Sequence, residues 1–357
     1  MKSSDSTRYI YAQSNSFDPY FNLALEKFLF DNVHDDEVIF YLWQNEKTVV
    51  AGRNQNIYKE CNLTNLKALG GHAARRLSGG GCVFHDLGNL NFTFVAKDNL
   101  YDLEKQLRVI ARACDSFGLK ATVSGRNDIT INDRKFSGNA FYESHGRKLH
   151  HGTIMIDVDS LILGNVLNVN REKLVSKGVD SVASRTANLS EFNSSITPDK
   201  MKEALRTAFK EEYGFKIFSE TLSLGGQSVL RDTGKGGWTS SGSMLNMLKS
   251  ISENQKFFSA DDWLFGKKYD FSNIISDQFP WGEIEICTVV RGDTIREAKV
   301  FSDSLKPDFI TAFEAGLKNT KYTYEGISEA LNSVSSNHDP DISVICNDIK
   351  NLIKREI

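Results

Sequence analysis

The chain has 357 residues, enough for one large or two ordinary domains. Apolar residues make up 40% and charged residues 25%, which is normal for a globular protein, and the formal net charge of −3 excludes a generally basic nucleic-acid binder. No apolar run reaches membrane-spanning length, and residues 1–7 form no apolar signal core. We therefore expect a cytoplasmic protein, or a mitochondrial one if a transit peptide has been removed.

The elements of the first half follow from capping residues and apolar periodicity. Asp18 and Pro19 predict the start of a helix. A second helix is expected over residues 101–117, with Gly118 as its end. Residues 132–133 predict a two-residue hairpin turn. Strands are expected at residues 37–43, 48–52, 91–95, 128–131, 134–136 and 149–158.

The second half predicts a helix at 198–213 and then a change of composition. Residues 222–258 are polar and glycine-rich, which favours a flexible connection with a single short helix. Strands near 283–290 and 294–301 and helices near 307–317 and 339–354 predict a small α+β unit. We therefore expect a ligand-binding domain at 1–221, a linker or insertion at 222–258, and an accessory domain at 259–357. Clustered strands favour a mixed or antiparallel sheet with packed helices over a doubly wound parallel sheet.

The five cysteines lie far apart in the sequence, at Cys61, Cys82, Cys114, Cys287 and Cys346. Their odd number and wide spacing predict neither a zinc site nor a disulfide framework, and reduced thiols are expected. Cys82 alone lies in a motif. We interpret it as a small packing residue; a nucleophile activated by His85 is the alternative, because thiolate chemistry needs such a base.

The most informative stretch is residues 75–89, Arg-Arg-Leu-Ser-Gly-Gly-Gly-Cys-Val-Phe-His-Asp-Leu-Gly-Asn. Successive glycines allow positive φ and close approach to a ligand, and their N–H groups can surround an anion. Arg75 and Arg76 add positive charge in a geometry that matches phosphate or carboxylate. No Gly-Lys-Ser/Thr and no helix follows, so neither a Walker loop nor a dinucleotide fingerprint is present. A plain flexible turn is the alternative for the glycines alone.

Taken whole, this string resembles the signature of the lipoate–protein ligase family. Further segments resemble the same family, at residues 20–26, 49–56, 60–62, 124–129, 134–140, 151–153, 177–189, 279–282 and 300–305. Nearly the whole chain is thereby covered. The main departure is 222–258, which is longer and more polar than the usual linker of the family.

The resemblance implies a catalytic domain of the biotin/lipoyl ligase-like, class II synthetase-like α+β fold with a small C-terminal domain. It also implies an ATP-dependent ligase that forms lipoyl-AMP and pyrophosphate from lipoate and then acylates a lysine. ATP with Mg²⁺ and lipoate would be substrates, and no tightly bound prosthetic group is expected. Implied partners are lipoyl domains of 2-oxoacid dehydrogenase acyltransferase subunits and the glycine-cleavage H protein, without nucleic acid or membrane, and the chain is expected to be a monomer.

The resemblance further assigns residues to roles. Lys135 matches the catalytic lysine, and Asp128 is expected to orient either this lysine or the incoming amine and to contact Mg²⁺. From position alone, Lys135 would be an exposed hairpin lysine and Asp128 a turn residue. Contacts to ATP and lipoyl-AMP are implied for Arg76, Gly81, Cys82, Val83, Phe84, His85 and Lys135. Contacts to lipoate are implied for Arg53, Ser78, Gly79, Gly80, Lys135, Ser137, Gly138, His151, Gly152 and Thr153. A core histidine is the alternative for His151.

Other activities on this fold remain as alternatives. Octanoyl and lipoyl transferases use a cysteine thioester, and their cysteine lies near the hairpin or the strands after it. Residues 115–286 contain no cysteine, which disfavours these transferases. A transferase that uses preformed lipoyl-AMP but cannot activate lipoate is a closer alternative, which only a test of ATP dependence separates from a full ligase. Biotin–protein ligases carry a basic Gly-Arg-Gly-Arg-type loop, which this sequence lacks. A non-catalytic acyl-adenylate sensor is the remote possibility, and no helix-turn-helix or basic patch supports a version that reads DNA.

Overall fold

The computed structural model describes residues 7–124, 127–168, 186–214, 219–224, 227–233, 241–267, 270–335 and 339–357. The chain divides into two compact units, which are described one at a time. Unit 1 comprises Met1–Val50, Cys61–Ala74 and Val83–Leu264. Unit 2 comprises Ala51–Glu60, Arg75–Cys82 and Phe265–Ile357. It therefore contains residues 75–82, here called the glycine loop, in addition to the C-terminal part of the chain.

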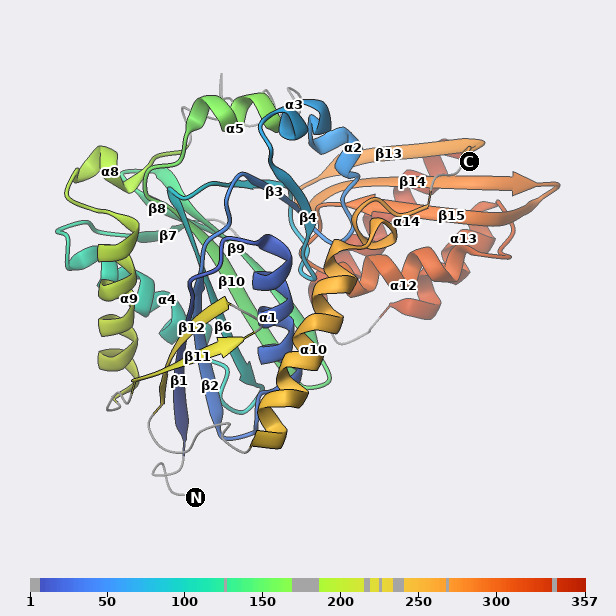
Figure 1. The fold of residues 1–357 in the computed structure, drawn as a ribbon. Coiled ribbons are helices and arrows are strands. Elements are labelled where there is room, and N and C mark those ends of the chain that lie inside the picture. Colours follow the sequence, from blue (N-terminus) through green and yellow to red (C-terminus); the bar gives the residue numbers. More distant parts are fainter. Residues whose placement is uncertain are drawn as a thin grey trace. The chain divides into compact units, whose positions relative to one another are not determined.

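Unit 1 is built on a nine-stranded sheet with the strand order β11-β12-β1-β2-β6-β10-β9-β8-β7 (Figure 1). Strands β1 and β2 pair in parallel and the other neighbours pair antiparallel, so the expected mixed sheet is confirmed. The strands are β1 Arg8–Ser14, β2 Glu37–Trp43, β6 Asn89–Lys97, β7 Thr122–Ser124, β8 Asp128–Ile131, β9 Arg134–Ser144, β10 Arg147–Met155, β11 Ser219–Leu224 and β12 Gln227–Thr233.

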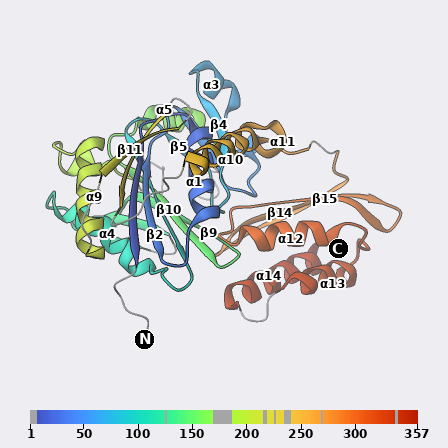
Figure 2. The same cartoon turned by 60° about the horizontal axis from the view of Figure 1, so that its bottom comes forward.

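Helices cover both faces of this sheet (Figures 1 and 2). On one face lie α4 (Leu103–Asp115) and α9 (Pro198–Tyr213), and on the other lies α1 (Pro19–Asn32), against which α10 (Ser241–Ser259) packs. The predicted start of α1 is confirmed, because the Asp18 side chain accepts a hydrogen bond from the first turn. Shorter helices are α3 Leu63–Ala68, α5 Ser160–Val166, α8 Leu189–Phe192 and α11 Asp261–Leu264.

A second, three-stranded sheet carries the ends of the glycine loop. Its order is β4-β3-β5, with β3 at Thr48–Ala51, β4 at His72–Arg75 and β5 at Val83–His85. Residues 76–82 therefore connect two strands that both flank β3. Strands β4 and β5 thus hold both ends of the loop.

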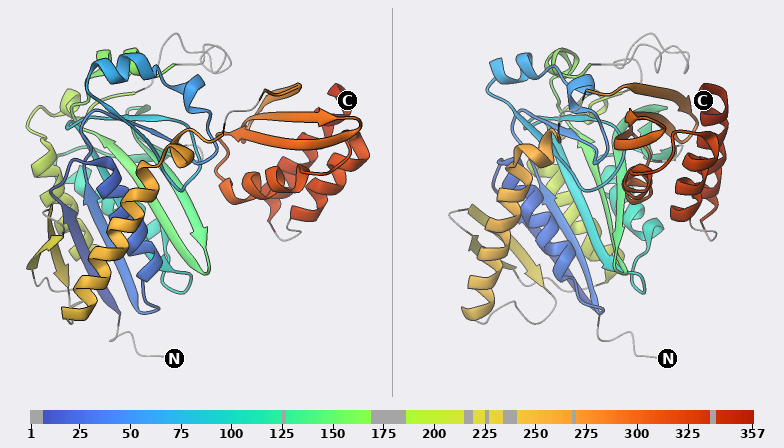
Figure 3. Two further views of the ribbon diagram at one scale, coloured as in Figure 1. Left: turned by 45° about the vertical axis from the view of Figure 1, so that its right-hand side comes forward. Right: turned by 90° about the vertical axis from the view of Figure 1, so that its right-hand side faces the viewer.

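The C-terminal part of unit 2 is the small α+β domain expected from the sequence. Strands β13 (Asn273–Phe279), β14 (Gly282–Arg291) and β15 (Thr294–Ser302) form a meander. Three helices pack against one face of it (Figure 3). They are α12 Pro307–Leu317, α13 Tyr324–Val334 and α14 Pro340–Glu356. The single-turn helix α2 (Ile57–Glu60) also belongs to unit 2.

The structure differs from the interpretation of 222–258 as a flexible connection with one short helix. Strand β12 extends the large sheet by pairing with β1, and α10 is a helix of 19 residues. Met247, Ile251 and Phe258 of α10 are buried, so this helix is part of the core of unit 1. The glycines of this stretch at 225–226 and 236–237 lie outside the described residues. Within the described part of the chain, no helix combines the length and apolar character needed to cross a membrane.

Candidate active site

The hairpin β8–β9 brings Lys135 and Asp128 together. Asn132 and Asp133 have φ values of 49° and 62°, as the tight turns that fit strand twist require. The Lys135 Nζ atom lies 2.7 Å from Asp128 Oδ1, and the two side chains are 34% and 25% exposed, so this ion pair is open to a ligand. A Cβ atom added at Gly138 would lie 2.9 Å from Lys135 Nζ, so the end of the lysine side chain packs directly against this glycine.

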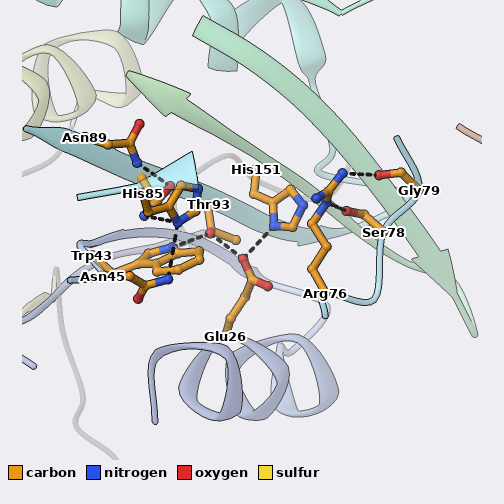
Figure 4. Close-up of polar contacts among 11 residues, drawn as sticks. Glu26, Trp43, Asn45, Arg76, Ser78, Gly79, His85, Asn89, Thr93 and His151 are labelled. Atoms are coloured by element: carbon orange, nitrogen blue, oxygen red, sulfur yellow. Dashed lines mark hydrogen bonds and ion pairs between the residues drawn. The ribbon is translucent and has the colours of Figure 1, made fainter. Parts of the chain in front are cut away.

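His151 belongs to a buried network of hydrogen-bonded side chains (Figure 4). Glu26 Oε1 accepts hydrogen bonds from Thr93 Oγ1 at 2.7 Å and from His151 Nδ1 at 2.8 Å. Trp43 Nε1 donates to Thr93 Oγ1 at 3.0 Å. The hydrogen bond to Glu26 therefore places a proton on His151 Nδ1 and fixes the orientation of the ring. No role was predicted for Glu26, because its separation of 125 residues from His151 leaves no local signal in the sequence.

His85 and Asp86 have different surroundings. His85 is buried, and its Nδ1 lies 3.2 Å from Asn45 Nδ2, so this ring nitrogen accepts a hydrogen bond (Figure 4). Asp86 accepts from the main-chain N–H of Gly88 and of Asp159, each at 2.8 Å. Asp86 thus braces the turn after the loop and the residue that caps α5.

The glycine loop, residues 75–82, is folded around the Arg76 side chain in unit 2. The Arg76 guanidinium donates to Ser78 Oγ at 3.1 Å and to the carbonyl oxygen of Gly79 at 2.7 Å (Figure 4). It also donates to the carbonyl oxygen of Gly81 at 2.8 Å. Arg76 is only 7% exposed. The loop is therefore an ordered structure, and the alternative of a plain flexible turn does not describe it.

The Arg75 guanidinium, which was predicted to add positive charge for an anion, donates to main-chain carbonyl oxygens. Its Nη1 donates to the carbonyl oxygens of Gly52, Arg53 and Gln55 at 2.8–3.1 Å. Burial lowers the pKa of Arg75 to about 10, so it still carries its proton at neutral pH. Arg75 is a structural cation that joins the residues after β3 to the start of the loop.

Close backbone contacts explain two of the loop glycines. Gly80 has a φ of +86°, where a β-branched side chain is strained. A Cβ atom at Gly79 would lie 2.1 Å from the carbonyl oxygen of Ser304, and Gly80 N–H donates to this oxygen at 3.3 Å. Arg53, predicted to contact lipoate, forms an ion pair with Asp308 of α12 in the same unit.

The predicted residues therefore fall into two groups. Unit 1 holds Lys135, Asp128, Ser137, Gly138, His151, Gly152 and Thr153, together with Val83, Phe84 and His85 on β5. Unit 2 holds Arg53, Arg76, Ser78, Gly79, Gly80, Gly81 and Cys82. Thr153 Oγ1 accepts from Gly138 N–H at 3.3 Å, so the strand after the hairpin supports the lysine site.

The cysteines offer little for thioester chemistry. Burial raises the pKa of the Cys61 thiol to about 11 and those of Cys114 and Cys287 to about 12. Cys346 is buried as well, and Cys82 is partly exposed. Only Cys82 lies in a predicted site. Among the residues that the structure describes, no group of three or more histidine, cysteine, aspartate or glutamate side chains could hold a metal ion.

Comparisons with known proteins identify related sequences and structures. The profile of the lipoyl protein ligase A/B catalytic domain matches residues 18–210, and that of the bacterial lipoate protein ligase C-terminus matches residues 268–353. Lipoate-protein ligase A of Bdellovibrio bacteriovorus is 35% identical over 329 residues, which are 91% of this chain and 92% of that protein. The crystal structure of P. falciparum LipL1 in complex with lipoate is similar with a TM-score of 0.78 and 29% identity, covering 96% of this chain and 99% of the other. The bi-partite lipoate protein ligase of Thermoplasma acidophilum, studied with its E2 lipoyl domain, has a TM-score of 0.56 and 25% identity over 70% of this chain and 94% of its own. The chain belongs to the lipoyl protein ligase A/B family.

Proposed function

We propose that this protein is an ATP-dependent lipoate–protein ligase. It converts lipoate and ATP to lipoyl-AMP and pyrophosphate and then transfers the lipoyl group to a lysine of a lipoyl domain. The observation that carries this proposal is the solvent-accessible pair of Lys135 and Asp128, placed by its hairpin in a chain that matches both parts of the family.

Adenylate formation brings two anions together, the lipoate carboxylate and the α-phosphate of ATP. One carboxylate oxygen bonds to the α-phosphorus and pyrophosphate leaves. A cation between the two groups stabilises the charge that develops in the transition state, and a compact ammonium suits that position. We assign this role to Lys135, with Asp128 holding the ammonium in place.

The other predicted contacts form the remainder of the proposal. Arg76 donates to loop carbonyls, and we propose that a phosphate oxygen of the adenylate replaces one of these acceptors. Residues 81–85 accompany Arg76 at the nucleotide. Lipoate is assigned to Arg53, to the loop at 78–80 and to the acyl pocket, which comprises Ser137, Gly138, His151, Gly152 and Thr153.

In the second step the amine of an acceptor lysine attacks the acyl carbon, an amide bond forms, and AMP leaves. Lipoyl domains are the proposed acceptors, which is consistent with the E2 lipoyl domain named for the Thermoplasma acidophilum enzyme. Acyltransferase subunits of 2-oxoacid dehydrogenases and the glycine-cleavage H protein would carry these domains. A monomer in the cytoplasm is the simplest form of the enzyme.

Mg²⁺ enters this proposal as part of the ATP substrate. Among the described residues Asp128 is the carboxylate beside the catalytic lysine, and one carboxylate with substrate phosphates is a common magnesium environment. Such an ion arrives with the nucleotide, so Asp128 would need to supply only a single protein ligand.

The test is ATP–pyrophosphate exchange with and without lipoate, followed by transfer to an isolated lipoyl domain. We expect exchange that depends on lipoate. Transfer from synthetic lipoyl-AMP without exchange would instead identify a transferase that cannot activate lipoate. Binding of lipoyl-AMP without exchange or transfer would identify a non-catalytic sensor.

A further inference from the structure

His150, which precedes His151 on β10, has no place in the proposed ligand contacts although it is fully buried. Its ring stacks on Phe141 and Phe94 with centroid distances of 5.0 and 6.0 Å, and Phe92 meets it edge-on at 5.3 Å. Burial lowers the pKa of His150 to about 3. The imidazole is therefore neutral, and only one of its two nitrogens carries a proton.

The hydrogen-bond partners decide which nitrogen that is. Nε2 lies 2.9 Å from Asn139 Oδ1, and the orientation of this amide is fixed because Asn139 Nδ2 donates to the Asn127 carbonyl at 3.0 Å. Since Asn139 Oδ1 can only accept, the proton of His150 is on Nε2. Nδ1 must then accept a hydrogen bond.

Gln106 of α4 completes the assignment. Its side-chain amide lies 2.9 Å from His150 Nδ1, and with Oε1 facing the ring Gln106 Nε2 is buried without a partner within the described structure. Flipping the Gln106 side-chain amide lets its Nε2 donate to His150 Nδ1 and leaves only the amide oxygen of Gln106 without a partner. Amide flips of this kind are assigned from the hydrogen-bond network. The chain of donors thus runs from Gln106 to His150 to Asn139.

This chain ends at the catalytic hairpin. Asn139 and Asn127 exchange three hydrogen bonds, from the main-chain N–H and Nδ2 of Asn139 to the Asn127 carbonyl and from Asn127 Nδ2 to the Asn139 carbonyl, at 2.7–3.0 Å. Asn127 directly precedes Asp128, which lies opposite Gly138 in the strand register. Asn139 is therefore linked through Asn127 to the backbone of Asp128, whose carboxylate pairs with Lys135.

We propose that Asn139, held by His150 and Gln106, is a positioning residue for the Lys135–Asp128 pair in adenylate formation. This inference rests on the proposed ligase function. Asn139 acts through Asp128 and is not assigned a contact to either substrate. Because a displacement of about 1 Å at a reacting group can cost about a hundredfold in rate, loss of this support is expected to be visible in kcat.

The principal variant is Asn139→Asp, which keeps the size of the side chain and the acceptor for His150 but removes the donor to Asn127. We expect kcat of lipoate-dependent ATP–pyrophosphate exchange to fall about tenfold or more, with KM for lipoate and ATP changed less than about threefold. In the double variant with Asp128→Asn, the loss should be no larger than that of Asp128→Asn alone, because both changes disturb one unit. Losses that multiply would show that Asn139 does not act through Asp128 and would overturn the proposal.

A second pair of variants tests the distant end of the chain, should Asn139→Asp not fold as judged by circular dichroism. Gln106→Met removes the donor to His150, and Val109→Ala disturbs the same buried helix face without touching the polar chain. We expect Gln106→Met to lower kcat per folded molecule and Val109→Ala to leave it unchanged. Equal effects of the two would refute a specific role.

Nitrogen NMR of the histidine rings gives a readout that needs no activity. The proposal requires His150 to be the Nε2–H tautomer in the parent protein, and the Nδ1–H tautomer would overturn it. A parent protein without lipoate-dependent exchange would refute the ligase function itself. Exchange in the parent together with multiplying losses would refute only the role of Asn139.

Discussion

Acid should destabilise this protein through one buried ring, His150. The folded-state pKa of His150 is about 3 because the ring is completely buried and lies beside His151, whereas an unfolded histidine has a pKa of about 6.5. Between these values the unfolded chain binds a proton that the folded chain excludes. The contribution of His150 to the free energy of unfolding therefore rises with pH in this window and reaches its full value above about pH 6.5.

The magnitude follows from linkage. Each pH unit between the two pKa values changes the free energy of unfolding by about 1.4 kcal/mol. Lowering the pH from 7 to 5 should thus remove about 2 kcal/mol, and lowering it to 4 about 3 kcal/mol, from this residue alone. Because the ring is fully buried, solvent screening does not reduce these values.

The assay is urea-induced unfolding at pH 4, 5, 6, 7 and 8, for the parent and for His150→Phe. The phenyl ring retains the stacking on Phe94 and Phe141 but cannot titrate, so the difference between parent and variant isolates the histidine. His34→Gln is the control, at an exposed histidine to which the burial argument does not apply. A parent-minus-variant difference that is constant from pH 7 to 5 would refute the neutral, proton-excluding ring.

The remaining predictions concern the lysine site and the loop. Lys135→Ala should lower pyrophosphate exchange by about a hundredfold or more, since one electrostatic donor contributes about 3–4 kcal/mol to transition-state stabilisation. The variant should still fold, because the exposed ion pair adds less than about 1 kcal/mol to stability. Lys135→Arg should not restore the rate, and a folded alanine variant with parental exchange would remove Lys135 from the mechanism. Cys82→Ala should keep substantial activity because an adenylate needs no thioester, and an acyl group trapped on the parental thiol would contradict this. Gly80→Val should weaken lipoate binding in equilibrium titrations because of its positive φ, and Gly79→Ala should do the same by displacing the loop from Ser304. Gly81→Ala is the matched control, because a Cβ atom added there would meet no atom within 4 Å; equal affinities of the three glycine variants would assign these glycines to a simple turn.

Local signals in the sequence were sufficient for much of the fold. Asp18 and Pro19 predicted the start of α1, and the turn at 132–133 predicted the hairpin. Because that hairpin has only two turn residues, it also predicted that Asp128 and Lys135 would lie on adjacent strands. These features depend on residues a few positions apart, which is why a sequence reveals them.

Features that depend on distant residues were missed. Helix α10 follows a glycine-rich stretch and gains its burial from α1, more than 200 residues earlier in the chain, so its own composition gave little evidence of it. Glu26 of α1 lies in a segment that resembles the family but received no role, because its partners Thr93 and His151 come from the distant strands β6 and β10. The ligand contacts assigned to the loop and the acyl pocket stay predictions, since they derive from the family resemblance.

The two adjacent arginines of the loop illustrate why residue type alone does not determine a role. Both guanidinium groups are buried and both donate to carbonyl oxygens, but Arg75 joins the segment after β3 whereas Arg76 contacts the loop itself. If a phosphate enters, Arg76 can exchange a neutral carbonyl for a charged acceptor, which forms the stronger hydrogen bond. A buried cation is never left unpaired during that exchange, so the desolvation cost of an isolated charge is avoided. The loop can therefore be ordered before the adenylate forms and still retain a donor for it.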